Sequence, residues 1–331
     1  MNLMAGTGAW AAFTRRNGAR GGGCPRCGHA RYSVLYTAAD RLYRTTDHQY
    51  QIVECGRCRL LRLHPQPAAG ELGQFYPDNY WWAPDDSAVG RLEGLYRRLV
   101  LSDHVRFVWL GLGDRAPVLD VGCGGGSFLA ALRRRGVRVV GLDLSRRAAG
   151  VAWRENGVPV ACGTLEGSPF PAESFGAITL FHVLEHLPEP PACLQAARRL
   201  LAPDGRLYAQ VPNAACWQFL LLGERWSGID VPRHLIHFRT EDLEDLLWQC
   251  GFRVLRRKFF SLRDNPTGLA TSLFPQLEPM SRKVRQVVES PRTRLLKDLL
   301  YLAVVAAALP VTALEAAAGA GSTILVEAAK R

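Results

Sequence analysis

The sequence predicts an α/β protein with a doubly wound, Rossmann-like sheet of seven strands, preceded by a small zinc-ribbon-like module. Two observations predict it. Residues 118–144 run from a short apolar stretch through a glycine-rich turn and an amphipathic stretch to a second apolar stretch, the order of strand, helix and parallel strand. Two Cys-x2-Cys pairs, at 24–27 and 55–58, lie nearer the N-terminus, and such pairs hold zinc in small modules.

The composition is that of an ordinary soluble globular protein. The chain has 331 residues, of which 48% are hydrophobic and 21% charged, so it can hold one large domain and an appended module. The formal net charge is +11, carried almost entirely by arginine. This charge predicts either a polyanionic partner, nucleic acid or an anionic membrane, or an arginine-rich solvated surface. Because the arginines are spread along the chain, both interpretations stay open.

The N-terminal residues 1–23 are rich in glycine and alanine and are expected to be a disordered tail. They contain no apolar core of about 7 to 15 residues, so no signal peptide is expected. Nine cysteines without an export signal favour a reducing compartment, and we expect a cytoplasmic protein.

Residues 24–75 are predicted to form the zinc-binding module, with Cys24, Cys27, Cys55 and Cys58 as four thiolate ligands. The gap between the two pairs is long enough for a β-hairpin. Four sulfur ligands close the coordination sphere, so the zinc would be structural. A disulfide pair is disfavoured by the compartment, and a redox site would need only one pair. The five other cysteines are expected to be small core residues. A helical linker is expected over 76–115.

The glycine-rich turn follows the predicted strand Val118–Val121 and can bring a ligand close to the backbone. Asp143 ends the next strand, where an acid can hydrogen-bond a ribose diol. A dinucleotide fingerprint needs Gly or Ala at the position of Ser127, so that pattern fails. Asp120, two residues before the first glycine, would repel a pyrophosphate but attract a cationic ligand.

This order of segments resembles the class I methyltransferases that bind S-adenosylmethionine. The resemblance covers residues 116–260 and includes the segments Phe181–Pro188 and Leu200–Leu207. It implies a methyl-transferring enzyme with S-adenosylmethionine as cofactor. The acid that would pair with adenine is missing, and the Thr164 hydroxyl with the Leu165 N–H is the substitute. The implied cofactor-binding residues are Asp120, Gly122, Gly124, Gly126, Asp143, Leu144, Thr164, Leu165, Phe181 and His182.

The acceptor is expected beyond the carboxyl ends of the strands, next to the loop 212–238. This loop holds His234 and His237, and His186 follows the fourth strand; all three are candidate general bases. Each histidine could instead brace a loop or the helix that begins at Thr240. A divalent metal beside His186 is possible but not favoured, because the upstream residue is His182 and not an acid.

Residues 261–320 are predicted to be a helical insertion between the sixth strand and the final strand. The final strand lies within 321–331 and is expected to pair antiparallel with the sixth. The insertion has an apolar run, 299–314, that contains Pro310 and is shorter than the ~20 residues of a membrane span. Before this run lie six basic residues that could face an anionic membrane: Arg282, Lys283, Arg285, Arg292, Arg294 and Lys297. If the flanking strands share one sheet, a single crossing is excluded as well. The insertion is then either a lid or a contact with an anionic membrane.

Together these observations predict an S-adenosylmethionine-dependent methyltransferase that methylates a hydroxyl of a sugar, glycolipid or secondary metabolite. The acceptor would be a small molecule or a lipid-linked glycan, and nucleic acid is the less expected partner. An rRNA or tRNA methyltransferase, supported by zinc and charge, is the alternative. A non-catalytic protein that retains the fold is a third, which the intact glycine motif and Asp143 argue against.

Overall fold

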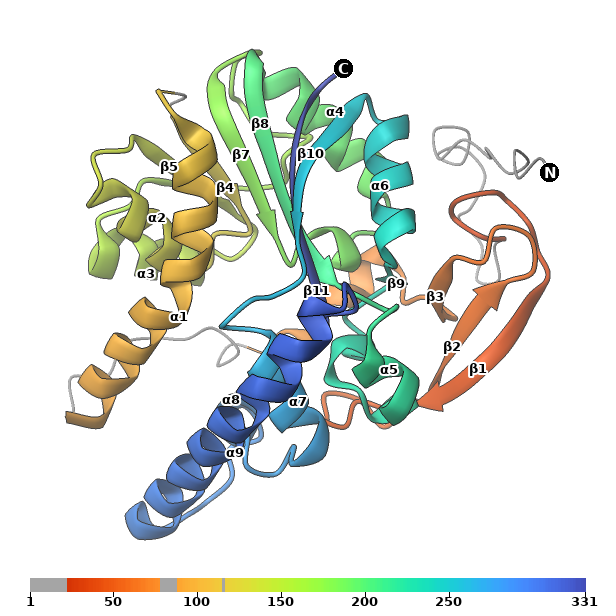
Figure 1. Cartoon of the computed structure of the whole chain (residues 1–331), viewed down its shortest axis with the longest axis vertical. Helices are drawn as coiled ribbons and strands as arrows, with labels where there is room; N and C mark the ends of the chain where they lie inside the picture. The colour runs from red at the N-terminus through yellow and green to blue at the C-terminus, as the bar shows by residue number, and fades with distance from the viewer. Residues whose placement is uncertain (1–22, 78–87, 115–116) are drawn as a thin grey trace.

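The computed structural model describes residues 23–77, 88–114 and 117–331, and its larger sheet has seven strands in the order β10-β11-β8-β7-β4-β5-β6 (Figure 1). The strands β4 to β8 run parallel, and β11 lies antiparallel between β8 and β10. The doubly wound sheet and the antiparallel last strand are thereby confirmed. The strands are β4 Val118–Val121, β5 Val139–Asp143, β6 Val160–Cys162, β7 Phe175–Phe181, β8 Leu201–Pro212, β10 Phe252–Lys258 and β11 Thr323–Lys330.

Helices cover both faces of this sheet. Successive side chains of a strand point to opposite sides, so the apolar strands make both faces apolar and both must be covered. Val118 of β4 packs in one apolar cluster with the helices α1, α2 and α3. Its neighbour Leu119 packs in another cluster with α4 and α6. The second half of α1 is buried in the first of these clusters, so this part of the predicted linker belongs to the sheet's own layers. The helices are α1 Ala88–Leu112, α2 Ser127–Arg133, α3 Arg146–Asn156, α4 Pro190–Leu200 and α6 Thr240–Gln249.

The N-terminal module is a second, four-stranded sheet in the order β1-β2-β3-β9. Its own strands are β1 Tyr32–Ala38, β2 Tyr50–Cys55 and β3 Leu61–His64, and the short helix η2 Ala69–Phe75 follows. The fourth strand, β9 Ile236–His237, comes from the loop after β8 and pairs with β3. Since Ile52 of the module and Leu180 of the larger sheet lie in one apolar cluster, the module is built onto the core and shares its interior.

The insertion leaves the sheet after β10 and returns at β11, which pairs with β10 as expected (Figure 1). It contains α7 Asn265–Leu273, α8 Pro279–Val284 and α9 Pro291–Ala317. The prediction that its apolar run is too short to span a bilayer was wrong. Helix α9 continues through Pro310 and has 27 residues, enough by length and composition to cross a membrane, and only 28% of its most apolar window is buried. A proline removes one helical hydrogen bond without having to end the helix.

Residues 1–22, 78–87 and 115–116 lie outside the described residues, and with them almost all of the predicted disordered tail and residues 78–87 and 115 of the predicted linker.

Candidate functional site

The predicted cofactor residues come together at one edge of the larger sheet, where its parallel strands end. The glycine turn follows β4, Asp143 is the last residue of β5, and Thr164 follows β6. Phe181 ends β7, and His182 is the next residue. In open parallel sheets, ligands bind outside the carboxyl ends of the strands. The sequence separation of these residues is large, and the parallel register of the strands is what aligns them.

The glycine turn is locked to the end of β5 by Asp143. The N–H of Gly124 donates to Asp143 Oδ2 at 2.8 Å, and the N–H of Ser145 donates to Oδ1 at 2.8 Å. Gly126, with φ 75°, begins α2, and a Cβ there would lie 2.9 Å from the Cβ of Ala152. A side chain at this position would therefore push α2 away from α3. Asp143 keeps lone pairs for a ligand while it holds the turn.

Asp120 is an acid inside the sheet. Its side chain lies in the middle of β4, is 4% exposed, and accepts a hydrogen bond from Thr179 Oγ1 at 2.6 Å. Burial raises the pKa of Asp120 to about 7, against the opposing effect of the Thr179 hydrogen bond. A cation bound nearby would favour the carboxylate, so this residue is suited to an ammonium or sulfonium group.

Three further predicted cofactor residues differ in exposure. Leu144 and Thr164 are exposed, and the Thr164 hydroxyl accepts from the N–H of Gly167 at 3.3 Å. Leu165 is buried.

The expectation that the isolated cysteines are all core residues was wrong for Cys162. This residue is exposed at the end of β6, because that strand is at the edge of the sheet. The other four are buried: Cys123, Cys193, Cys216 and Cys250.

His182 is enclosed by acids that the sequence did not predict. Its φ is 55°, its Nδ1 lies 3.1 Å from Glu185 Oε1, and its Nε2 lies 3.5 Å from Asp264 Oδ1. Gln210 donates to Asp264 Oδ2 at 2.7 Å. Burial opposes a charge on His182, but the carboxylates of Asp264 and Glu185 outweigh it and raise the pKa of His182 to about 9. Because Asp264 belongs to the insertion, this pair ties the insertion to the edge of the sheet.

The three candidate bases have different surroundings. His186, in the short helix η4 Leu184–His186, stacks edge-on against His234, with ring centroids 4.6 Å apart. The hydroxyl of Tyr76 lies 2.8 Å from His186 Nδ1. Burial and His234 lower the pKa of His186 to about 4. His237 lies in β9 and is 3% exposed, and neither of its ring nitrogens has a hydrogen-bond partner in the part of the chain that the structure describes. His237 therefore faces the protein interior, in the strand that completes the module's sheet.

Arg233, just before His234, is the centre of a buried ion cluster. Its side chain is 0% exposed and donates to Asp40 of the module at 2.9 and 3.1 Å. It also donates to Asp230 at 2.7 and 3.0 Å, and its guanidinium lies over the ring of Tyr43. The acceptor-side loop and the module are thus held together by one cation between two carboxylates, an arrangement that no local sequence pattern indicates.

The four predicted zinc ligands form a cluster. The Sγ atoms of Cys24, Cys27, Cys55 and Cys58 all lie within 4.8 Å of one another, and no disulfide joins them. Four sulfur atoms bound tetrahedrally to one zinc at about 2.3 Å are about 3.8 Å apart, which is within this limit. The donor set therefore fits a structural zinc ion, held between the turn before β1 and the turn after β2.

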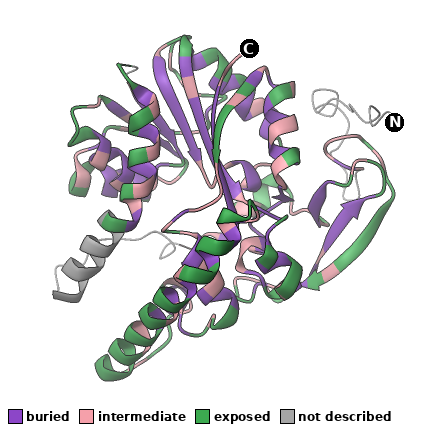
Figure 2. Ribbon diagram, viewed as in Figure 1, coloured by how far each residue is buried: buried purple, intermediate pink, exposed green. Residues whose placement is uncertain are grey.

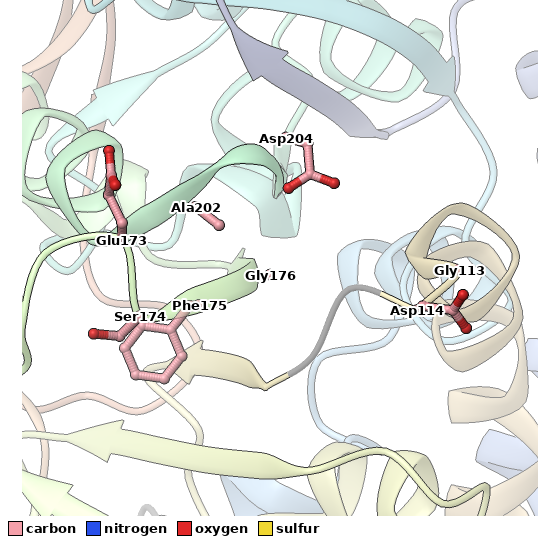
Figure 3. Close-up of a pocket in the computed structure, with 8 residues that line it drawn as sticks. All are labelled: Gly113, Asp114, Glu173, Ser174, Phe175, Gly176, Ala202 and Asp204. Atoms are coloured by element: carbon pink, nitrogen blue, oxygen red, sulfur yellow. The ribbon is translucent and has the colours of Figure 1, made fainter.

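A hollow of about 530 Å³ lies at the opposite edge of the sheet (Figure 3). It is lined by the start of β7, the start of β8 and the end of α1. Glu173 and Asp204 make its wall acidic. Because it lies at the amino ends of the parallel strands, it is on the wrong side for the glycine turn and Asp143, and we do not assign it to the reaction.

A parallel sheet with a glycine turn after its first strand and an acid at the end of the second is the architecture of S-adenosylmethionine-dependent methyltransferases. Residues 94–257 match a family described as a methyltransferase domain. The Xanthomonas oryzae pv. oryzae ubiquinone biosynthesis O-methyltransferase is 31% identical over 196 residues, which cover 54% of this chain and 79% of that protein. The protein of the same name from Paracidovorax citrulli is 35% identical over 154 residues, 43% of this chain and 60% of that protein.

A methyltransferase structure from Archaeoglobus fulgidus is 18% identical, with a TM-score of 0.48 over 74% of this chain and 100% of that chain. The chain belongs to the class I S-adenosylmethionine-dependent methyltransferases.

Proposed function

We propose that the protein transfers a methyl group from S-adenosylmethionine to a hydroxyl of a small molecule. The observation that carries this proposal is the position of the His186 and His234 rings. His186 belongs to the segment that follows β7, on the same edge of the sheet as the glycine turn and Asp143, and the His234 ring packs against it. The relatives named above are O-methyltransferases by name, which supports oxygen as the acceptor atom.

In this proposal the cofactor is held by the ten residues that the family resemblance implies. Asp143 faces the ribose, and Asp120 faces the cationic end of the cofactor. The acceptor side consists of His186, His234 and the loop around them. The reaction breaks the bond between the sulfonium sulfur and the methyl carbon and forms a carbon–oxygen bond, and the acceptor proton leaves. The enzyme's main tasks are to align the acceptor and to receive that proton.

The proposal is tested by comparing small-molecule and lipid extracts of a deletion strain and its complemented parent by mass spectrometry. We expect a compound in the deletion strain that is lighter by one methylene than its counterpart. The purified protein should convert it with S-adenosylmethionine. Methylated RNA nucleosides that disappear in the deletion strain, with unchanged metabolites, would contradict the proposal.

Replacing Asp143 should weaken cofactor binding. Asp143→Ala removes charge-assisted hydrogen bonds worth about 1.5–3 kcal/mol, which corresponds to a roughly 10- to 150-fold higher Kd for S-adenosylmethionine. Calorimetric titration measures it, with Glu155→Ala, on the exposed end of α3, as the control. An unchanged Kd in Asp143→Ala would remove Asp143 from the site.

Cofactor affinity should rise with pH because of Asp120. Its pKa of about 7 in the free protein means that the carboxylate, which attracts the cationic cofactor, forms as the pH rises from 6 to 8. Since that folded pKa exceeds the unfolded value of 3.8, the free protein also loses stability as the pH rises toward 7. Asp120→Asn should show neither dependence. Calorimetric titrations with S-adenosylmethionine at three pH values test this prediction. If the affinity of the wild type and of Asp120→Asn changed with pH in parallel, the prediction would be contradicted.

We further propose that a lipid-linked acceptor is met at an anionic membrane, where the insertion docks. Helix α9 projects from the body and is exposed along much of its length (Figure 2). Val288 is 99% exposed just before it and Leu296 67% exposed within it. Two of the predicted membrane-facing cations are engaged elsewhere, because Arg282 pairs with Glu289 and Asp298, and Lys297 with Glu289.

The membrane contact then rests on the remaining basic residues, of which Arg292 and Arg294 are exposed in the first turn of α9, and on the exposed Val288 and Leu296. Arg292→Gln with Arg294→Gln should reduce binding to anionic vesicles by about 2 kcal/mol, roughly 30-fold, at low salt. The same changes at Arg134 and Arg135, exposed after α2, are the control. Vesicle sedimentation measures it. Equal recovery in the supernatant with neutral and anionic vesicles would leave the insertion as a lid.

A further inference from the structure

A pair of serines joins the insertion to the acceptor-side loop 212–238. Ser227 begins the short turn η6 Ser227–Ile229 of that loop, and Ser272 lies in α7 of the insertion. The N–H of Ser227 donates to Ser272 Oγ at 2.8 Å, and Ser227 Oγ donates to the carbonyl oxygen of Gly268 at 2.9 Å. Ser272 Oγ donates to the same carbonyl at 2.7 Å. These three hydrogen bonds hold the turn against α7.

The same turn determines which nitrogen of His234 carries the proton. The carbonyl oxygen of Gly228, the residue after Ser227, lies 2.9 Å from His234 Nδ1. A carbonyl oxygen only accepts, so Nδ1 must donate, and in the neutral ring Nε2 keeps its lone pair. Among the residues that the structure describes, Nε2 has no hydrogen-bond partner, since Asp230 Oδ2 is 3.9 Å away and accepts from Arg233. His234 is therefore prepared to accept a proton at Nε2.

The turn is closely packed, so its position depends on the serine pair. A Cβ at Gly228 would lie 2.2 Å from the ring of Trp226, which is itself 2% exposed. Ser272 is 3% exposed, and water cannot replace its hydroxyl without a change in the packing around it. A buried N–H without an acceptor is unfavourable. Removal of the Ser272 hydroxyl should therefore displace the turn and, with it, the carbonyl that faces His234.

Helix α9 supports this contact from the other side of α7 and makes a second one to the same loop. The hydroxyl of Thr271, next to Ser272, lies 2.8 Å from the Tyr301 hydroxyl of α9. Glu315, near the end of α9, is 1% exposed and accepts from the backbone and side-chain nitrogens of Gln218 at 3.0 and 2.7 Å. Gln218 lies in α5 Trp217–Leu222 of the acceptor-side loop. The insertion thus holds this loop at two separate places.

We propose that Ser272 is a positioning residue for His234. Through the turn η6 it keeps the proton of the neutral imidazole on Nδ1 and leaves the lone pair of Nε2 for the proton of the acceptor hydroxyl. The insertion is then a fixed brace of the acceptor-side loop, whether or not its exposed helix also contacts a membrane. The role in catalysis rests on the proposed methyl transfer, in which a base receives that proton. The chain of hydrogen bonds from α7 to the imidazole does not.

The first measurement is nuclear magnetic resonance of the full-length protein with ¹⁵N-labelled histidines, which distinguishes the two imidazole tautomers. The His234 signals are those that His234→Gln removes. The neutral ring should be protonated at Nδ1 in the wild type, and Ser272→Ala should give a mixture of both tautomers. Ser227→Ala removes one bond to α7, should shift the signals in the same direction, and decides the matter should Ser272→Ala fail to fold. The control is Ser281→Ala, a buried serine of α8 that donates to the Glu278 carbonyl.

The second measurement is methyl transfer to the compound that accumulates in the deletion strain. Ser272→Ala should lower kcat roughly 10-fold, because a displaced base is poorly aligned with the acceptor, and should leave the Kd for S-adenosylmethionine unchanged.

Three results would overturn the inference: a wild-type His234 protonated at Nε2 alone, a His234 spectrum that Ser272→Ala and Ser227→Ala leave unchanged, or a changed spectrum with the kcat of the wild type. A loss of cofactor affinity equal to the loss of kcat would also overturn it, because Ser272 would then support the fold in general. If the wild type shows the Nδ1–H tautomer but methylates no compound, the proposed function fails and the chain of hydrogen bonds stands.

Discussion

Arg233→Met should destabilise the protein by about 3–5 kcal/mol, the cost of breaking a buried ion cluster by removing one partner. Arg233 is the cation between Asp40 and Asp230, both of which would remain as carboxylates without their main donor. The long apolar side chain of methionine fills much of the vacated space, so the loss reports on the charges more than on a cavity.

Urea unfolding measures this loss, and a control separates it from ordinary surface electrostatics. Arg257→Met breaks a surface pair between the exposed Arg257 and the half-buried Glu244 and should cost no more than about 1 kcal/mol. Asp40→Asn with Asp230→Asn, combined with Arg233→Met, should recover much of the loss because the buried charges are removed. Equal stability of Arg233→Met and Arg257→Met would show that the cluster does not hold the module to the core.

Loss of zinc should have the second large effect. Cys27→Ser removes one thiolate from the cluster, and structural zinc ions stabilise small modules by several kcal/mol or more. The module should loosen, and β9 with it, because β3 pairs with β9. Cofactor binding should persist in the soluble fraction, since the glycine turn and Asp143 lie in the larger sheet.

Elemental analysis and thermal unfolding measure the effect, with Cys162→Ser as the control for replacing an exposed thiol outside the cluster. The wild type should contain one zinc ion at the four cysteines, and Cys27→Ser should lose it together with its stability. Iron in place of zinc, or wild-type stability in Cys27→Ser, would contradict the structural zinc.

Local patterns predicted the elements well. The apolar run Val118–Val121 and the glycines after it are a strand and a turn in the structure, and Thr240 begins a helix as expected. Such features depend on residues within one turn or one strand, where hydrophobic period and backbone sterics decide the outcome. The antiparallel position of the last strand was also predictable, because the family resemblance supplied the order of the sheet.

The length of helix α9 was harder to predict from local composition. The apolar run 299–314 suggested a segment too short to span a membrane, whereas α9 is 27 residues long. Ser290 accepts a hydrogen bond from the N–H of Thr293 and starts the helix well before the run, and Pro310 does not end it. A helix boundary is set by capping and by what packs on either side, and a hydropathy pattern reports neither.

By itself, the sequence determined the local strands and helices, the glycine turn with Asp143 and the two Cys-x2-Cys pairs, because each depends on residue type and short spacing. The family resemblance added the order of the seven strands. Only the tertiary structure decided which residues of different elements contact one another. It brought Asp40 to Arg233 across 193 residues, Asp264 to His182, and His234 to Glu185. The physical reason is that an ion pair and the pKa of a buried imidazole are properties of a packed environment. Their energies depend on burial and on partners that chain distance does not reveal.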